Sequence, residues 1–185
     1  AANSRNLANA GPAFSGLRHL PAVPLASQPC SVSAEVTDPD NVTSVTLFYS
    51  VAGGAWQSAA MTAAGSTWTA DIPGQSAGAV VQFYLQAADT ASAVAEFPAA
   101  GQNSRALIQW NDSQANIGLA HNVRLILTAA DRTLLFTGSN LMADNYTGCT
   151  VVYDESEIFY GCGVRLKGSE HGRADAGRQS YNISF

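Results

Sequence analysis

The sequence predicts a mainly β protein, in which a β-sandwich is followed by a small α+β segment. Apolar residues make up 46% of the 185 residues, enough to bury a core, whereas charged residues make up only 12%, about half the share of an ordinary soluble domain. Short runs that alternate apolar and polar residues continue to about residue 110, as expected for half-buried strands. Beyond that point the pattern changes to a strand, a short helix, a hairpin and a final strand.

The charge balance restricts the partners. A net charge of −5 argues against nucleic acid as a main partner, because binding phosphates requires a surplus of Lys and Arg. No apolar run reaches the roughly 18 residues that a membrane span requires. A polar surface made mostly of Ser, Thr, Asn, Gln and Gly favours an extracellular protein, and residues 1–4 suit a mature N-terminus left after signal-peptide cleavage.

Residues 1–28 are predicted to form an extended arm. The segment contains Pro12, Pro21 and Pro24 and shows neither a helical nor a strand period, and proline removes backbone donors and favours extended conformations. The arm either lies over the surface as a leader or packs on this or a neighbouring molecule. Its apolar residues, such as Phe14 and Leu17, keep the second possibility open.

Four strands are expected in the sandwich, because period-two runs are separated by turn signals. They cover residues 31–37, 43–51, 68–72 and 81–87. Short strands at this spacing are typical of a β-sandwich. Phe48 and Tyr84 fall on the face opposite the main apolar run, so another part of the chain or another molecule is expected to cover them.

The last third of the chain changes character. Residues 98–118 are expected to be a connector, with Trp110 packed at the seam between two domains. After a strand at 122–128, Thr128 has the features of a helix N-cap, with Asp131 in the capping-box position, so a short helix is expected over 129–136. A hairpin with strands 149–153 and 158–166 follows, and the final strand covers 180–185.

Three cysteines give an odd count. If the hairpin loop is symmetric, Cys149 faces Cys162, and directly opposed residues have Cβ atoms about 4.5–5.5 Å apart. A disulfide draws such a pair to about 3.8 Å, so a Cys149–Cys162 bridge is predicted, which would imply an oxidising compartment. The alternative is two reduced cysteines on one strand pair. Cys30 has no assigned role.

Two groups of motifs resemble known families. Residues 36–40, 45–50 and 80–84 look like the immunoglobulin-like or fibronectin-type modules of bacterial exported proteins. The second group resembles the opening of the CotH family of spore-coat, protein-kinase-like proteins. It consists of residues 163–169, two downstream arginines and residues 181–185.

The resemblance implies an immunoglobulin-like sandwich over 29–110, the start of a CotH-like domain over 111–185, and a bacterial-type extracellular or cell-surface location. The metal-binding and catalytic carboxylates of the CotH family lie beyond the part that is similar. Phosphoryl transfer requires those groups as well as phosphate contacts, so no catalytic residue is assigned and this chain is not expected to be an enzyme.

A basic cluster near the end of the chain is a candidate anion or phosphate site. Glycine allows backbone N–H groups to approach an anion, and arginine offers a bidentate fork. The alternative is a solvated strand face followed by a turn. The cluster consists of Arg165, Lys167, Gly168, Ser169, Arg173 and Arg178.

Smaller motifs suggest two further kinds of site. Asp38 and Asp40 offer oxygens to a calcium ion, although a plain turn has the same composition. Asn41, Asn111 and Asn145 begin Asn-x-Ser/Thr sequences that a host could glycosylate. The histidines and cysteines lack the spacing of metal ligands, so no other metal and no cofactor is predicted.

These observations lead to three functional hypotheses. The first is a non-catalytic secreted or cell-surface structural protein that interacts with itself or with other surface components, self-assembling through its N-terminal arm or its C-terminal edge strand. The second is the N-terminal fragment of a CotH-like secreted kinase. The third is a carbohydrate-binding module that holds glycans on a platform formed by Phe48, Trp56, Trp68 and Tyr84. The alternative is that these aromatics, like most aromatics on strands, belong to the core.

Overall fold

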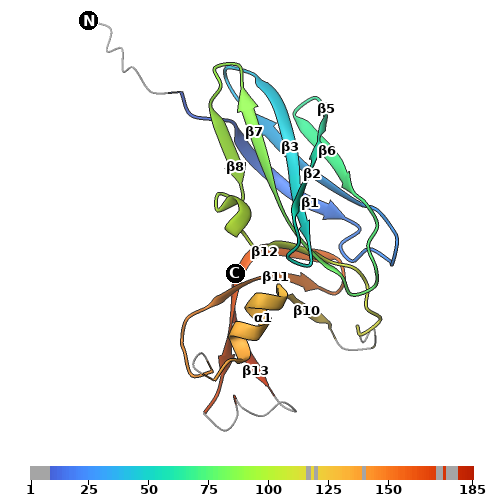
Figure 1. Ribbon diagram of the computed structural model, residues 1–185, viewed down its shortest axis with the longest axis vertical. Coiled ribbons are helices and arrows are strands. Elements are labelled where there is room, and N and C mark those ends of the chain that lie inside the picture. Colours follow the sequence, from blue (N-terminus) through green and yellow to red (C-terminus); the bar gives the residue numbers. More distant parts are fainter. Residues whose placement is uncertain (1–8, 116–117, 119–120, 139–140, 170–172, 174–178) are drawn as a thin grey trace, which may run out of the picture.

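A computed structural model describes residues 9–115, 118, 121–138, 141–169, 173 and 179–185 (Figure 1). Within these ranges the protein is mainly β, with several antiparallel sheets and one short α-helix. The predicted fold class, a β-sandwich followed by a small helix-containing segment, is confirmed. No helix among the described residues combines the length and the apolar character needed to cross a membrane.

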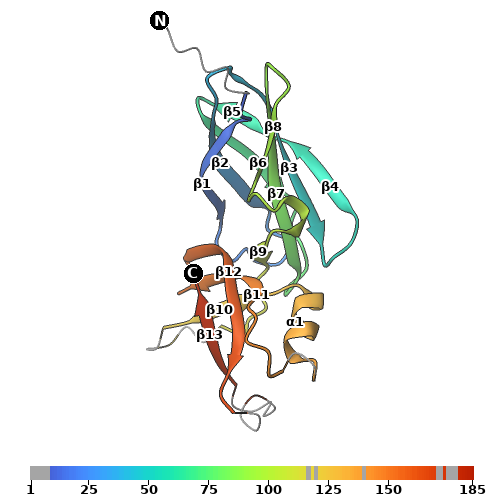
Figure 2. The same cartoon turned by 90° about the vertical axis from the view of Figure 1, so that its left-hand side faces the viewer.

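Two antiparallel sheets form the sandwich, and they are seen as two layers in Figure 2. The first has the order β1-β2-β6-β5. Its strands are β1 Ala13–Leu20, β2 Cys30–Thr37, β5 Thr62–Ala64 and β6 Thr67–Ile72. The second has the order β4-β3-β7-β8, and β9 also pairs with β7. Its strands are β3 Val42–Val51, β4 Trp56–Ala60, β7 Val80–Asp89, β8 Val94–Phe97 and β9 Ala106–Gln109.

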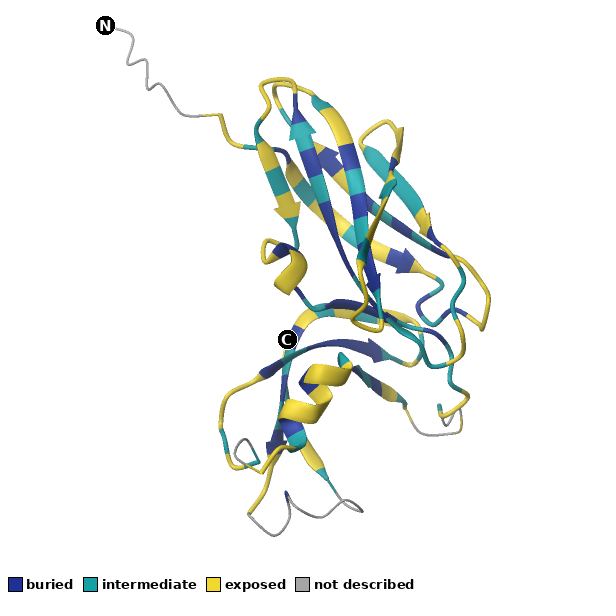
Figure 3. Cartoon of the chain, in the orientation of Figure 1, coloured by how far each residue is buried: buried dark blue, intermediate teal, exposed yellow. Residues whose placement is uncertain are grey.

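The core of the sandwich follows from the alternation of side chains along the strands. Val32 and Ala34 of β2 face Leu47 of β3, and Val81 and Phe83 of β7 complete the layer, all of them buried. In Figure 3, buried positions are interspersed with intermediate or exposed ones along β3, whereas β7 has only buried and intermediate positions. The residues between these positions therefore point outward, and on β3 and β7 they form a face of their own.

A second, smaller unit follows the sandwich. Its sheet has the order β10-β11-β12-β13, and a 3₁₀-helix, η1, precedes it at Gly101–Asn103. The elements are β10 Val123–Ile126, α1 Ala129–Phe136, β11 Thr147–Tyr153, β12 Glu157–Lys167 and β13 Ser180–Ser184. One face of this sheet packs on Leu135 of α1. Val152 on the other face packs on Leu107 of β9, so the sheet lies between the helix and the sandwich.

Helix α1 begins where the sequence predicted. The Thr128 hydroxyl accepts a hydrogen bond from the Asp131 amide at 3.1 Å and donates to the Asp131 carboxylate at 2.7 Å. The carboxylate also receives the Arg105 guanidinium, with Nε 2.5 Å from Oδ2. The N-cap therefore links the helix both to its own first turn and to the segment that leaves the sandwich.

The expectation that residues 1–28 have no strand structure is wrong for Ala13–Leu20. This segment is β1, which pairs antiparallel with β2 at the edge of the first sheet. Its period is hidden because a β-bulge between Ser15 and Arg18 shifts the register, with Gly16 at φ 60°. The prolines flank the strand and do not interrupt it, so they are compatible with an edge position.

The expected connector at 98–118 contains a buried strand. Ala106 and Ile108 of β9 face the sandwich core, whereas Leu107 faces the C-terminal sheet. Because both faces are buried, the run is continuously apolar and shows no alternation. Trp110 lies in the sandwich core, not at a seam, and its indole Nε1 donates to the Gln28 carbonyl at 2.9 Å.

In the hairpin of β11 and β12, Cys149 lies opposite Cys162 as predicted, but the pairing nearer the loop differs from the prediction. Tyr153 pairs with Glu157 and not with Ile158, but a β-bulge beyond Phe159 restores Cys149 opposite Cys162. Gly161 supplies the bulge with φ 65°. The extra residue also reverses the alternation, so that Ile158 faces the sandwich and Cys162 faces α1.

The predicted disulfide is absent, because Cys30, Cys149 and Cys162 are all free thiols in the structure. Opposition across a strand pair is necessary for a disulfide but does not by itself bring the Cβ atoms close enough. The Cys162 thiol instead donates to the Phe159 carbonyl at 3.4 Å. Burial, and then the neighbouring Cys162, raises the pKa of Cys149 to about 12, so its thiol stays protonated in this apolar setting.

A buried histidine joins β1 to β12. His19 is fully buried, with Nε2 3.0 Å from the Ala22 carbonyl and Nδ1 2.5 Å from the Tyr160 hydroxyl. A carbonyl only accepts, so Nε2 carries the proton and the neutral Nδ1 accepts from Tyr160. Burial lowers the pKa of His19 to about 4, against the raising effect of the Ala22 contact.

Candidate functional site

Three aromatic side chains gather on the outer face of the second sheet. Phe48 of β3 lies directly opposite Tyr84 of β7, and their rings stack with centroids 4.9 Å apart and planes 8° apart. Trp56 of β4 meets Tyr84 edge to face, with centroids 5.2 Å apart. We call Phe48, Trp56 and Tyr84 the aromatic triad.

The sequence places the triad by alternation and by one small residue. Leu47 is in the core, so its neighbour Phe48 points outward. Trp56 pairs with Ser50, whose buried hydroxyl donates to the Gly54 carbonyl at 2.7 Å. Because Ser50 is small, the indole can extend over it toward Tyr84 on the next strand.

The three rings differ in how they meet solvent. Phe48 and Trp56 are half-buried, whereas Tyr84 is only 5% exposed. Burial, and then the charge of Glu96, raises the pKa of Tyr84, so its hydroxyl keeps its proton. Tyr84 therefore supports the other two rings, which remain available for contact from outside.

Polar side chains border the triad on the same face. Gln86 donates to Glu96 at 3.1 Å. The Gln82 amide nitrogen donates to the carbonyls of Gln102 and Ser104 at 2.8 and 2.6 Å, which fixes its orientation. Half-buried aromatic rings beside amide and carboxylate groups can take the apolar face of a ligand together with its hydroxyl groups.

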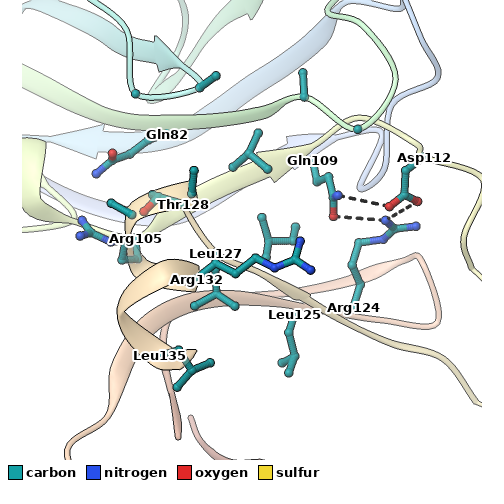
Figure 4. A pocket seen from close by; sticks show the side chains of 18 of the residues that line it. Gln82, Arg105, Gln109, Asp112, Arg124, Leu125, Leu127, Thr128, Arg132 and Leu135 are labelled. Atoms are coloured by element: carbon teal, nitrogen blue, oxygen red, sulfur yellow. Dashed lines mark hydrogen bonds and ion pairs between the residues drawn. The ribbon is translucent and has the colours of Figure 1, made fainter. Parts of the chain in front are cut away.

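A groove of about 1130 Å³ adjoins this face, between the second sheet and the C-terminal unit (Figure 4). Gln82 lines it from β7, Leu127 and Thr128 line it from the segment between β10 and α1, and Arg132 lines it from α1. Gln82 and Tyr84 are two residues apart on one strand, so they point to the same face. The aromatic triad and the groove are therefore neighbours, joined at Gln82.

Residues 27–94 match carbohydrate binding module family 56. No curated protein matches the chain. The match to family 56 includes all three residues of the aromatic triad but less than half of the chain, and it leaves out β1, β9 and the C-terminal unit. Nothing in these comparisons supports the immunoglobulin-like or fibronectin-type module or the CotH-family domain that the sequence resembles.

Of the four aromatics expected to form a sugar platform, the structure brings three together within the family 56 match. The fourth, Trp68, lies on the inner face of β6 and packs against the sandwich core. Gln82 and Gln86 were missed as site residues, although their alternation with the apolar residues of β7 places them beside Tyr84. Glu96 was missed because β8 was not predicted.

The predicted basic cluster lies outside the family 56 match, and its two described arginines, Arg165 and Arg173, are engaged by the protein. Arg165 forms an ion pair with Asp144 and lies over the Tyr146 ring, 5.4 Å from its centroid. Arg173 is 8% exposed; it donates to the carbonyls of Gly168, Leu141 and Ala143, with its Nη2 3.6 Å from Asp144.

The other members of the cluster have different surroundings. Lys167 and Gly168 are exposed, and the Ser169 carbonyl accepts from the Arg173 amide at 2.9 Å. Arg178 lies outside the described residues. Anion binding here stays a prediction, and Asp144, which the sequence gave no reason to single out, is the acid that neutralises the two arginines.

The predicted calcium ligands Asp38 and Asp40 lie close to Asp89, with one oxygen of each carboxyl within 4.8 Å of the others. Asp38 accepts from the Asp40 amide at 2.7 Å. Asp89 is buried and accepts from Asn9 and from the Ala93 amide at 2.5 and 2.8 Å. Burial would raise the pKa of Asp89, but these hydrogen bonds hold it below its ordinary value. Calcium binding stays a prediction.

The predicted glycosylation sites have different surroundings. Asn41 and Asn145 are exposed, and Asn41 adopts φ 66° in its turn. Asn111 is half-buried, and its side chain accepts from the Ser113 amide at 2.7 Å. Glycosylation at these positions stays a prediction.

Proposed function

We propose that this protein is a non-catalytic carbohydrate-binding protein of the extracellular space or cell surface. The observation that carries the proposal is the aromatic triad, a partly exposed stack of rings bordered by amides and a carboxylate, within the segment that matches a carbohydrate-binding family. The family is described as a binding module, so the proposal includes no catalysis. The low content of charged residues supports the extracellular location.

The chemistry of the face suits a sugar. A pyranose ring has an apolar face of C–H groups and a rim of hydroxyls. The rings of Phe48 and Trp56 would take the apolar face, and Gln86 and Glu96 would exchange hydrogen bonds with the rim. Tyr84 would act from beneath by holding the two outer rings in position.

Self-association was the leading hypothesis from the sequence, and it stays a prediction. β1 and β13 are edge strands of their sheets, and edge strands carry backbone groups that another chain could pair with. Edge position alone does not identify a partner, whereas the aromatic triad combines geometry with the family match. Carbohydrate binding is therefore the function that we propose.

The test is binding to a panel of soluble and insoluble polysaccharides, by retardation in affinity gels and by co-sedimentation. We expect Trp56→Ala and Phe48→Ala to weaken binding by about two- to tenfold each, because an aromatic contact contributes about 0.5–1.5 kcal/mol beyond its buried area. Phe159→Ala is the matched control, since Phe159 is an exposed aromatic of β12 outside the family match. Equal binding by all variants would refute the triad as the site, and absence of binding to every polysaccharide would refute the function.

A further inference from the structure

The groove beside the aromatic triad carries a charge that the proposed site does not use. The charged residues that line it are Arg105, Asp112, Arg124 and Arg132, three cations and one anion. The side chains that line the groove therefore carry more positive than negative charge, in a chain whose net charge is −5. Which of these cations is available to a ligand depends on the partner of each.

Two of the three arginines are held by carboxylates. Arg105 donates to Asp131 through Nε and Nη2, at 2.5 and 3.2 Å. Arg124 is 8% exposed and forms ion pairs with Asp112 and Glu155 at 3.0 and 2.9 Å. Asp131 and Glu155 do not line the groove, so they neutralise the charges of these arginines from positions outside it.

Arg132 is different. It lies on the exposed side of α1, and the ion pairs found among the described residues do not include it. Figure 4 shows its side chain extending from the helix into the groove toward the Gln109 side. Gln109 is itself engaged, donating to Asp112 at 3.3 Å and accepting from Arg124 at 3.2 Å. Among the residues that the structure describes, the guanidinium of Arg132 is thus the charge in the groove that no carboxylate holds and that is open to a ligand.

The rest of the groove fits the same class of ligand as the aromatic triad. Leu125 and Leu127 give it an apolar side, and Gln102 and Asn103 add amide groups. An apolar surface with scattered amides suits a sugar ring and its hydroxyls. Gln82 belongs both to the groove and to the outer face of β7, so a chain of sugar units can run from the triad into the groove without leaving the surface.

We propose that the groove is an extension of the glycan site, in which Arg132 binds a sugar unit that carries an anionic group, either a carboxylate or a sulfate ester. The inference rests on the proposed function, since it names the class of glycan. Arginine provides a planar fork of donors that matches both anions. Residues outside the family 56 match would then select glycans that carry an anionic group, whereas the triad within the match would stack on sugar rings whether or not they are charged.

The experiment compares neutral, uronic-acid-containing and sulfated oligosaccharides of equal length on a glycan array, followed by calorimetry with the best binders. The variants are Arg132→Gln, Arg132→Lys and Trp56→Ala, with Arg18→Gln as the matched control. Arg18 is an exposed arginine on β1, away from the groove. Arg132→Gln keeps a good helix former on an exposed helix position, so the fold is preserved.

We expect the wild-type protein to prefer one of the two anionic series. Arg132→Gln should lose that preference, by about tenfold in affinity, the loss expected for one charge-assisted contact at an exposed position. It should still bind neutral glycans as the wild type does, whereas Trp56→Ala weakens binding to every series. Arg132→Lys should retain part of the preference, and Arg18→Gln should retain all of it.

The outcomes separate the two proposals. If the wild type binds neutral and anionic glycans equally, or if Arg132→Gln keeps the anionic preference, the groove proposal is wrong and the carbohydrate-binding function stands. If no oligosaccharide of any series binds, the proposed function is wrong and the groove proposal fails with it. A preference for uronic acids over sulfated sugars, or the reverse, identifies the anion.

Discussion

Acidification should destabilise the protein through His19 before it protonates the carboxylates. The folded protein holds His19 neutral with a pKa of about 4, whereas an unfolded chain has the ordinary value of about 6.5. The unfolded state therefore binds a proton first as the pH falls. The free energy of unfolding should decrease between pH of about 6.5 and about 4, and the contribution is fully present above that window.

The magnitude follows from the two pKa values. Their difference, at about 1.4 kcal/mol for each pKa unit, corresponds to a loss of about 3 kcal/mol across the window. The groups that face His19 do not titrate there. The pKa of Tyr160 is raised by burial, and the Cys30 thiol has a pKa raised to about 12. The carboxyls whose pKa is lowered, such as that of Asp112, begin to lose their contribution only below the window.

The assay is urea denaturation at several pH values across this window, for the wild type and for His19→Gln. Glutamine can donate to the Ala22 carbonyl but does not titrate, so the variant should be less stable near neutrality yet nearly independent of pH within the window. Arg18→Gln is the control, because Arg18 is exposed on β1 and the change leaves His19 in place, and it should retain the wild-type slope. The reasoning is refuted if His19→Gln keeps that slope, or if the ring of His19 titrates at its ordinary pKa in the folded protein.

Two further predictions concern the bulge of the C-terminal hairpin and the buried cysteines. Gly161→Ala should lower the free energy of unfolding by about 1 kcal/mol, because φ 65° disfavours a Cβ even though nothing lies within 4 Å of it. Gly138→Ala, where the space is equally open and φ is not positive, should be close to neutral in the same denaturation assay, and equal effects would contradict the role of the bulge. Cys149 and Cys30, each with a pKa raised to about 12 by burial, should react with a thiol reagent only after unfolding. Rapid labelling of these two thiols in the native protein would show that they are accessible.

The sequence predicted those features that depend on local chemistry. The N-cap at Thr128 was found because its signature spans only four residues, and the main strands were found because period two survives in β2, β3 and β7. The bulges at Gly16 and Gly161 could not be predicted, since a single inserted residue interrupts a short alternating run in the same way as the end of a strand does. One hid β1 entirely, and the other changed the hairpin register around an otherwise correct cysteine pair.

The candidate site was predicted only in part for a similar reason. Phe48 and Tyr84 could be assigned to the outer face from alternation alone, but their contact depends on the pairing of β3 with β7, and that of Trp56 on β4 crossing the small Ser50. Strand pairing is a long-range property that no local pattern contains. Arg132 was not predicted as a site residue. It stands out only because carboxylates from other elements hold Arg105 and Arg124, and those pairings are visible only in the structure.

The position of Trp110 has a practical consequence for dissecting this protein. An excised fragment of residues 27–94 would lack Trp110, Ile108 and the whole of β1, which together close the sandwich core. It would expose apolar side chains on two unprotected strand edges, a combination that promotes aggregation. Ending the chain after β9 would still uncover Leu107, which the C-terminal sheet shields. Anyone who fuses this module to a reporter should therefore transfer the sandwich and the C-terminal unit together.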